Sequence, residues 1–326
     1  MGLESSGMTE AEPAAKKKKG HVVAEWLVYA ALRVLVAILG LLPIETNLRL
    51  ARFLGRCLWR LYGRGRRRAV ENLQASFPDK DLAWVERVGL RSFEQLVMLA
   101  VDVLFTPYLV GRHNWRQYST YVNVERCKWM MQEGQGLLLV TGHYGNFEIV
   151  GYLLGLFGFK IYSVARPLDN RFVDRYVRGI REQRGQKIID KKGAADLMAL
   201  APEQGASLGL IADQDAGRKG IFVDFFGRRA STFKSIAVLA VTRNMPVLVA
   251  YSRRVGNRFF FEIAVTRMIF PEEWADKEDP LQWITAEYTK AIEQFVREDP
   301  TQYWWVHRRW KTRPREEMAA SAVSGK

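Results

Sequence analysis

The stretch Leu137–Glu148 constrains the fold more than any other part of this 326-residue chain. It opens with a short apolar run, which ends near Val140 and follows two glycines, Gly134 and Gly136. A continuous apolar run bounded by glycines is typical of a strand buried on both faces, and such strands belong to sheets covered by helices. We therefore expect this run to be a buried strand of an α/β domain.

The loop after this strand carries an imidazole and a carboxylate. His143 follows Gly142 at the carboxyl end of the strand, where open α/β sheets bind their ligands. Asn146 suits the N-cap of an apolar helix, which places Glu148 in the first turn of that helix. An imidazole can accept the proton of a hydroxyl, and a carboxylate on its other nitrogen fixes the tautomer. We predict that His143 is a general base oriented by Glu148. The alternative is that His143 only hydrogen-bonds the loop.

Short apolar runs alternate with helical patterns in the rest of this region, which indicates one α/β domain with a mixed sheet flanked by helices. Further strands are expected at 160–165, 187–190, 208–212, 247–252 and 259–265. Helices are expected at 147–157, 170–184, 194–200, 232–243 and 281–297.

Charged residues come directly after two of these predicted strands. Arg166 follows the strand at 160–165, whereas Asp213 and Asp215 follow the strand at 208–212. If these groups converge with His143 at one edge of the sheet, they would form a site for a hydroxyl compound that carries phosphate. The alternative for 213–217 is a simple turn, because Asp and Gly are turn formers.

The N-terminal part of the chain has the features of a membrane anchor. Residues 22–43 are almost wholly apolar and have the length of a membrane span. No signal-peptide cleavage site follows them, so we expect an uncleaved anchor helix. The charges of Glu25 and Arg33 leave open a helix that lies partly in the interface, because a charge in the bilayer centre is costly.

A basic amphipathic helix is expected directly after the anchor. No acidic residue occurs between Glu45 and Glu71, and arginines recur there at helical spacing: Arg49, Arg52, Arg56, Arg60 and Arg64. A one-sided basic helix indicates contact with an anionic leaflet, although it could be an ordinary solvated face. Eight arginines after the anchor outweigh the four lysines at 16–19, which predicts that the bulk of the chain faces the cytoplasm. Residues 70–133 look helical, with few strand signals.

The net charge limits the classes of binding partner but does not identify one. A net charge of +14 fits nucleic acid, an anionic membrane, a phosphorylated lipid or an acidic carrier protein. The apolar anchor favours the last three over nucleic acid. Four histidines and two cysteines, Cys57 and Cys127, show no metal-ligand spacing and cannot form a disulfide framework. We expect a reducing compartment and no metal.

Four blocks of sequence together resemble a known family. The loop from His143 to Glu148 is similar to the His-x4-Asp/Glu motif of the lysophospholipid acyltransferase superfamily. Three further blocks, at 166–170, at 213–217 with 225–227, and at 302–311, occur in the order typical of its lipid A late-acyltransferase branch, the lauroyl and myristoyl transferases. The resemblance extends from the apolar N-terminal segment to Pro314. It implies a glycerolipid acyltransferase-like fold.

The resemblance also implies an activity and a location. The reaction would transfer a fatty acyl chain from acyl carrier protein, or from acyl-CoA, to a hydroxyl of a phosphorylated lipid A precursor, without a cofactor, at the inner membrane. Arg181 and Asp213 would belong to the active site, with Arg166, Asn170 and Asp215 as further substrate-binding residues. Other glycolipids or phospholipids are alternative acceptors. A non-catalytic lipid-binding or RNA-binding membrane protein is the alternative from another class.

The remaining expectations concern the ends of the chain and the oxyanion site. The tail at 303–313 interleaves aromatic and basic residues, which we expect to pack and to contact headgroups or the carrier. Backbone amides near Gly145 are the expected oxyanion donors. The chain divides into a disordered basic tail at 1–21, the anchor at 22–43, a helical membrane-proximal part at 44–133, the acyltransferase core at 134–314 and a disordered tail at 315–326.

Overall fold

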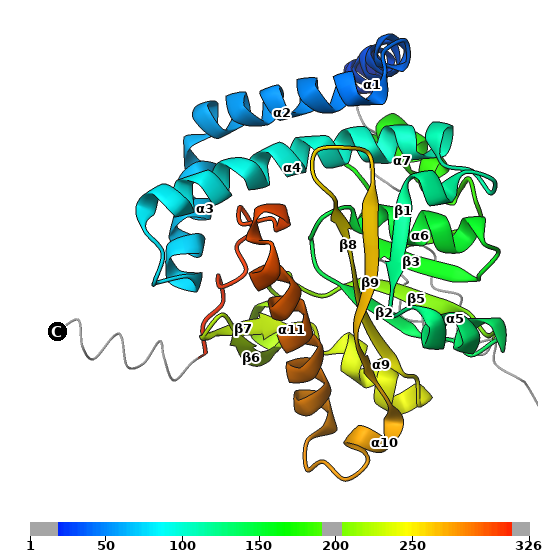
Figure 1. The fold of residues 1–326 in the computed structure, drawn as a ribbon, viewed down its shortest axis with the longest axis vertical. Coiled ribbons are helices and arrows are strands. Elements are labelled where there is room, and N and C mark those ends of the chain that lie inside the picture. Colours follow the sequence, from blue (N-terminus) through cyan, green and yellow to red (C-terminus); the bar gives the residue numbers. More distant parts are fainter. Residues whose placement is uncertain (1–18, 191–203, 315–326) are drawn as a thin grey trace, which may run out of the picture.

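A computed structural model describes residues 19–190 and 204–314 of the chain (Figure 1). The predicted helix at 194–200 and the tail at 315–326 lie outside the described residues. So does the predicted tail at 1–21, apart from residues 19–21, which begin the first helix.

The core is a seven-stranded mixed sheet, which confirms the predicted α/β fold class. Its strands lie in the order β1-β9-β8-β2-β5-β3-β4. They are β1 (Ser119–Val122), β2 (Leu138–Thr141), β3 (Ile161–Ala165), β4 (Lys187–Asp190), β5 (Ser207–Ile211), β8 (Val247–Arg254) and β9 (Phe261–Ile269). Strands β2, β3, β4, β5 and β8 are parallel to one another, whereas β1 and β9 run in the opposite direction.

One strand lies in a segment that the sequence presents as helical. Among the described strands, β1 pairs with β9 alone, in parallel, and so forms an edge of the sheet. A strand of four residues is too short to show a clear alternation of apolar and polar residues, and its partner β9 is far away along the chain. The α/β core therefore includes residues before 134.

Helices cover the sheet and extend beyond it (Figure 1). They are α1 (Lys19–Gly40), α2 (Ile44–Leu61), α3 (Gly63–Ser76), α4 (Leu82–Leu109), α5 (Glu125–Gln132), α6 (Phe147–Leu156), α7 (Arg171–Glu182), α9 (Ser235–Arg243), α10 (Pro271–Trp274) and α11 (Pro280–Glu298). Short 3-10 helices occur at Trp115–Gln117, Gly217–Lys219 and Pro300–Gln302. At one end of the molecule, α2 lies along α4, and α4 separates it from the sheet.

A hairpin that the sequence analysis did not predict packs against α11. It consists of β6 (Ile221–Phe225) and β7 (Arg228–Thr232), which pair in antiparallel fashion. Phe226 and Gly227 form its turn with φ values of 56° and 69°, as a two-residue hairpin turn of the primed type requires. Because Thr232 belongs to β7, the helix predicted at 232–243 begins only at Ser235.

The two charged residues within the expected anchor helix contact another helix of the protein. The backbone carbonyl of Glu25 accepts a hydrogen bond of 2.8 Å from Asn170 Nδ2, and its carboxylate lies 3.7 Å from Arg171 Nε. The Arg33 guanidinium lies over the ring of Tyr176, 4.9 Å from its centroid. Both internal charges of α1 therefore face α7, the helix that follows β3. The segment 21–40 is long and apolar enough to cross a membrane.

A buried ion pair joins α4 to the sheet. Arg254, in β8, binds the carboxylate of Asp102, and both side chains are almost completely buried. Arg254 also donates to the carbonyl of Arg258 and to Gln95 Oε1, at 2.8 and 3.2 Å. Burial raises the pKa of Asp102, and the charge of Arg254 opposes that rise. The pair fixes α4 above the strand that neighbours β2.

Replacement of one member of this pair should destabilise the fold. Asp102→Asn removes the charge that compensates Arg254, and loss of one partner of a buried pair costs about 3 to 5 kcal/mol. We expect a clearly lower urea midpoint for the detergent-solubilised variant. Asp79→Asn is the matched control, because Asp79 is exposed and pairs with Lys80 at the surface. Equal midpoints for the two variants would show that the buried pair does not stabilise the fold.

Candidate active site

The register of two central strands places His143 beside Asp213. β2 and β5 are parallel neighbours, with Thr141 opposite Ile211. His143 and Asp213 each come two residues after this pair. His143 Nδ1 lies 2.7 Å from Asp213 Oδ1, and the His143 backbone amide donates to Asp213 Oδ2 at 2.8 Å. Both residues are buried. Gly142 permits this approach, because a Cβ there would lie only 3.2 Å from the Asp213 carboxylate.

The environment keeps Asp213 ionised. Burial alone would raise the pKa of this carboxyl, but the ring and backbone amide of His143, with His307 nearby, hold the pKa well below its usual range. An ionised Asp213 accepts a hydrogen bond from Nδ1–H of His143. In the neutral imidazole, Nε2 is then the unprotonated nitrogen, and it can accept the proton of a hydroxyl.

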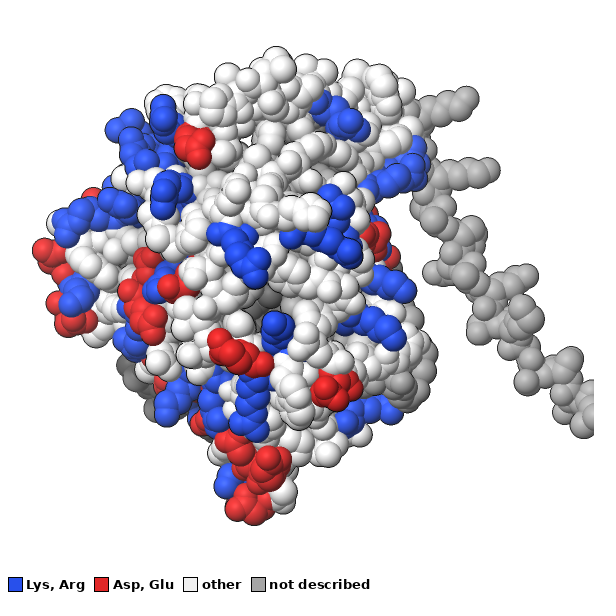
Figure 2. Space-filling view, turned by 45° about the vertical axis from the view of Figure 1, so that its right-hand side comes forward, with Lys and Arg blue, Asp and Glu red and all other residues white. Residues whose placement is uncertain are grey.

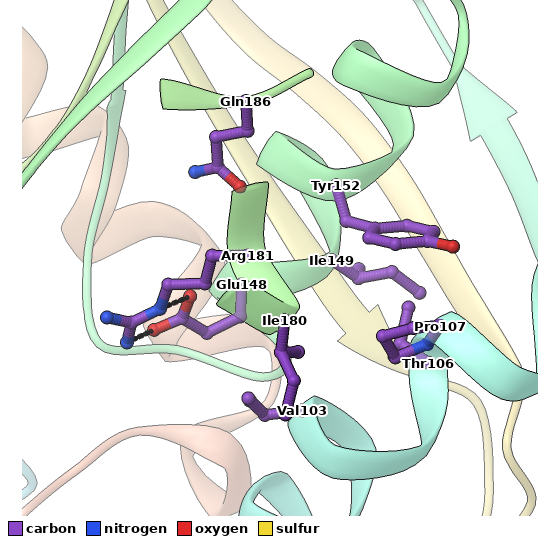
Figure 3. Close-up of a pocket in the computed structure, with 9 residues that line it drawn as sticks. All are labelled: Val103, Thr106, Pro107, Glu148, Ile149, Tyr152, Ile180, Arg181 and Gln186. Atoms are coloured by element: carbon purple, nitrogen blue, oxygen red, sulfur yellow. Dashed lines mark hydrogen bonds and ion pairs between the residues drawn. The ribbon is translucent and has the colours of Figure 1, made fainter. Parts of the chain in front are cut away.

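The predicted pairing of His143 with Glu148 is wrong. Glu148 does lie in the first turn of α6, and Asn146 caps that helix by accepting from the Ile149 amide at 3.0 Å. Its carboxylate, however, forms a bidentate pair with Arg181 of α7, at 2.9 Å from Nε and 2.5 Å from Nη2 (Figure 3). The helical start turns Glu148 toward α7, so Asp213 takes the place beside His143.

A small cavity adjoins this second ion pair. The empty space there, including the part that is open to solvent, is about 260 Å³, and Figure 3 shows the Glu148–Arg181 pair at one side of it. The other lining residues come from α4, α6 and α7 and from the position directly before β4: Val103, Thr106, Pro107, Ile149, Tyr152, Ile180 and Gln186. Most of this lining is apolar. The cavity therefore combines an apolar wall with a fixed guanidinium.

The C-terminal tail closes the site from the other side. The carbonyl of His143 accepts from the Trp304 amide at 3.1 Å, and the His143 ring lies 4.9 Å from the Trp304 ring and 4.6 Å from the His307 ring, measured between centroids. Burial and the nearby His143 lower the pKa of His307 to about 4, so His307 is neutral near pH 7. Tyr303 and Trp305 are buried, as packing of the tail requires.

His307 and Gln214 are site residues that the sequence analysis missed. Gln214 Nε2 lies 3.5 Å from His143 Nε2. The Gln214 carbonyl accepts from Arg309 Nη1 at 3.2 Å, and the buried Arg309 also binds Ser231 O and Thr232 Oγ1. His307 could have been noticed as one of only four histidines, within a block that the resemblance already included. No signal in the sequence singles out Gln214 from its loop.

Three other predicted site residues have their contacts elsewhere. Arg166 is exposed, and its recorded polar contact is with Asp169 at 3.5 Å. Asn170 caps α7 by accepting from the amides of Phe172 and Val173. Asp215 binds the amide and hydroxyl of Thr312 in the tail, at 3.3 and 2.9 Å. Asn170 and Asp215 therefore hold the start of α7 and the tail, whereas Arg166 lies at the surface.

The backbone amides expected to form an oxyanion site are already bonded. The Gly145 amide donates to Gln302 O at 3.0 Å, Tyr144 to Gly142 O at 2.8 Å, and Asn146 to Ser252 O at 2.9 Å. The amides of these three residues are therefore used within the protein, and the expectation of oxyanion donors near Gly145 stays a prediction for the first amides of α6. Among the described residues, no group of three or more His, Cys, Asp or Glu side chains is arranged to hold a metal ion.

Comparison with known proteins identifies the family. The model of the bacterial lipid A biosynthesis acyltransferases matches residues 14–312. The lipid A biosynthesis lauroyltransferase of Escherichia coli K12 is 24% identical over 291 residues, which are 89% of this chain and 92% of the relative. The palmitoleoyltransferase of the same organism is 26% identical over 251 residues, 76% and 78% of the two chains. A lipid A biosynthesis acyltransferase of Haemophilus influenzae is 28% identical over 262 residues, 77% and 80% of the two chains.

The family match spans both strand ends that form the His143–Asp213 pair, the Glu148–Arg181 pair beside the cavity, and the tail that closes the site. On this evidence the chain is an acyltransferase and belongs to the bacterial lipid A biosynthesis acyltransferase family.

Proposed function

We propose that this protein transfers a fatty acyl chain from an acyl thioester to a hydroxyl of a lipid A precursor, with His143 as the general base and Asp213 as its orienting partner. The observation that carries the proposal is the 2.7 Å contact between His143 Nδ1 and Asp213 Oδ1. The names of the relatives support the acceptor, since they are lipid A lauroyl, palmitoleoyl and myristoyl transferases.

The proposed reaction needs no covalent enzyme intermediate. His143 Nε2 takes the proton as the acceptor hydroxyl attacks the thioester carbon, and a new C–O bond forms while the carbonyl oxygen becomes an oxyanion. When the C=O bond re-forms, the C–S bond breaks, and the thiolate leaves with the proton from His143. Asp213 stabilises the imidazolium in between, because its carboxylate stays ionised.

The cavity beside the Glu148–Arg181 pair is our candidate for the acyl-chain groove. Its walls are mostly apolar, as binding of a hydrocarbon requires. Glu148 fixes Arg181 at its side, so that the guanidinium can face a phosphate or the thioester end of the donor. Arg181 remains a proposed substrate-binding residue, as do Arg166, Asn170 and Asp215 on the resemblance alone.

The donor proposed is acyl carrier protein, and the location is the cytoplasmic face of the inner membrane. The net charge of +14 suits an acidic carrier as well as a phosphorylated glycolipid and an anionic leaflet. Figure 2 shows few charged side chains at the end of the molecule where α1 and α2 lie, with Lys and Arg gathered below it. Exposed apolar side chains of α2, namely Leu50, Phe53 and Leu54, suit a membrane surface.

Double-mutant cycles should reveal two coupled pairs. His143→Ala and Asp213→Asn should each lower kcat by about 10² to 10⁴-fold, and the double variant should be little worse, because the two groups act as a unit. Glu148→Gln and Arg181→Gln should couple with each other in the same way. The assay is transfer from radiolabelled acyl carrier protein to a tetra-acylated lipid A precursor, in detergent.

Asp224→Asn serves as the control in these cycles, because Asp224 lies at the hairpin turn and accepts from the Gly227 amide. Its activity should match that of the native protein. Coupling of His143 with Glu148 in place of Asp213 would contradict the proposed dyad. Acylation of other lipids but not of the lipid A precursor would keep the mechanism and overturn the acceptor.

Membrane attachment should resist salt. We expect the full chain to stay in the membrane fraction in about 1 M NaCl, where electrostatic contacts are screened over a few ångströms, and to leave it in detergent. Fractionation followed by an immunoblot measures this, with a known peripheral protein as the control. Release by salt alone would contradict an apolar anchor and favour a protein that binds the membrane, or RNA, through charge.

A further inference from the structure

The proposed reaction requires a hydrogen-bond donor for the oxyanion, and the groups first expected to supply it are bonded to the protein. The backbone amides of residues 143 to 146 all donate to protein oxygens: His143 to Asp213, Tyr144 to Gly142, Gly145 to Gln302 and Asn146 to Ser252. Arg181 donates two of its five N–H groups to Glu148 beside the cavity, where we propose that it binds substrate. Candidate donors are therefore the side chains within hydrogen-bonding range of His143 Nε2, the atom at which the proposed reaction takes place.

We propose that the Gln214 carboxamide is the catalytic oxyanion donor of this acyltransferase, an assignment that rests on the function proposed above. In the described part of the chain, Gln214 is the one side chain with a donor in hydrogen-bonding range of His143 Nε2, at 3.5 Å. Nε2 is also the atom that must take the hydroxyl proton, because Nδ1 is bound to Asp213.

The chemistry of the contact suits this role. A carboxamide nitrogen carries two hydrogens, and neutral Nε2 is an acceptor, so Gln214 donates to Nε2 through a long, weak bond while no substrate is bound. When the acceptor hydroxyl donates its hydrogen bond to His143 Nε2, it replaces Gln214 there. The Gln214 N–H groups then lie unbonded beside the reacting carbon. They can then donate to the thioester oxygen as it becomes negative, and the proton still goes to His143.

The backbone of Gln214 is held in place, as a preorganised donor requires. Its carbonyl accepts from the buried Arg309, which also binds two residues at the end of β7. Asp213 on one side is bound to His143, and Asp215 on the other side is bound to Thr312 in the tail. The side chain itself is exposed, so the carboxamide can reach a substrate that enters over His143.

His307 is the alternative donor, because its ring lies close to that of His143 and its Nε2 is buried with no hydrogen-bond partner among the described residues. The two rings are in contact, with centroids 4.6 Å apart, and in the described part of the chain no hydrogen bond joins His307 to His143 Nε2. The observed contact therefore favours Gln214, and the experiment below separates the two residues.

The test compares native protein with Gln214→Ala, Gln214→Glu and His307→Gln, and uses Gln183→Ala as an exposed glutamine control. Two rates are measured for each: acyl transfer to the lipid A precursor, and hydrolysis of the acyl thioester by water in the absence of the precursor. Removal of one oxyanion donor should lower kcat by about 10² to 10³-fold with little change in KM. Gln214→Glu keeps the shape but loses the N–H groups and adds a charge, so it should be at least as slow as Gln214→Ala.

Hydrolysis distinguishes an oxyanion donor from a residue that only positions the lipid. Both reactions pass through the same oxyanion, so the Gln214 variants should lose transfer and hydrolysis in equal proportion. Loss of transfer with unchanged hydrolysis would overturn the assignment, as would full activity of Gln214→Ala. A comparable loss in His307→Gln with none in the Gln214 variants would assign the donor to His307. If native protein transfers nothing while it is folded and bound to detergent, the proposed function falls as well.

Discussion

The pairing of β2 with β5 is the constraint on which the site depends. These strands are separated along the chain by β3 and β4, yet they lie side by side in parallel register, with Leu138 opposite Leu208. Their carboxyl ends then bring an imidazole and a carboxylate within hydrogen-bonding distance. A slip of one residue would turn every side chain of a strand to the opposite face of the sheet, so the buried apolar residues of both strands also set the catalytic geometry.

The C-terminal tail completes this arrangement because it is part of the core. Trp305 and Arg309 are almost fully buried, and the Trp305 indole donates to the Pro300 carbonyl at 2.7 Å. Trp304 and His307, in the same tail, form a wall beside the His143 ring. A buried guanidinium is costly unless its donors are satisfied, and Arg309 uses three of them to join the loop that carries Gln214 to the end of β7. Packing and catalysis thus share the same residues.

The positions of the strand ends along the chain could be predicted from the sequence, but which strands lie side by side in the sheet could not. Apolar runs located β2 and β5, and therefore His143 and Asp213, whereas strand order depends on packing of the whole chain. Spacing along the chain suggested Glu148 as the partner of His143, because a residue five positions away is close in sequence. The N-cap at Asn146 starts α6 at once and turns Glu148 toward α7. The β6-β7 hairpin was missed because its turn, Phe-Gly, lacks the usual Asn-Gly or Asp-Gly signal.

Helix α7 connects the proposed anchor to the proposed acyl cavity. Its outer surface receives α1 through Phe172 and Tyr176, whose rings lie 6.1 Å from that of Tyr29. Its last turn carries Arg181 beside the cavity. Because α7 is a single short helix, the position of α1 in a membrane would also set the position of the cavity relative to the lipid surface. Charged residues in α1 are therefore compatible with an anchor: they hold it against the domain that would draw its acceptor from the bilayer.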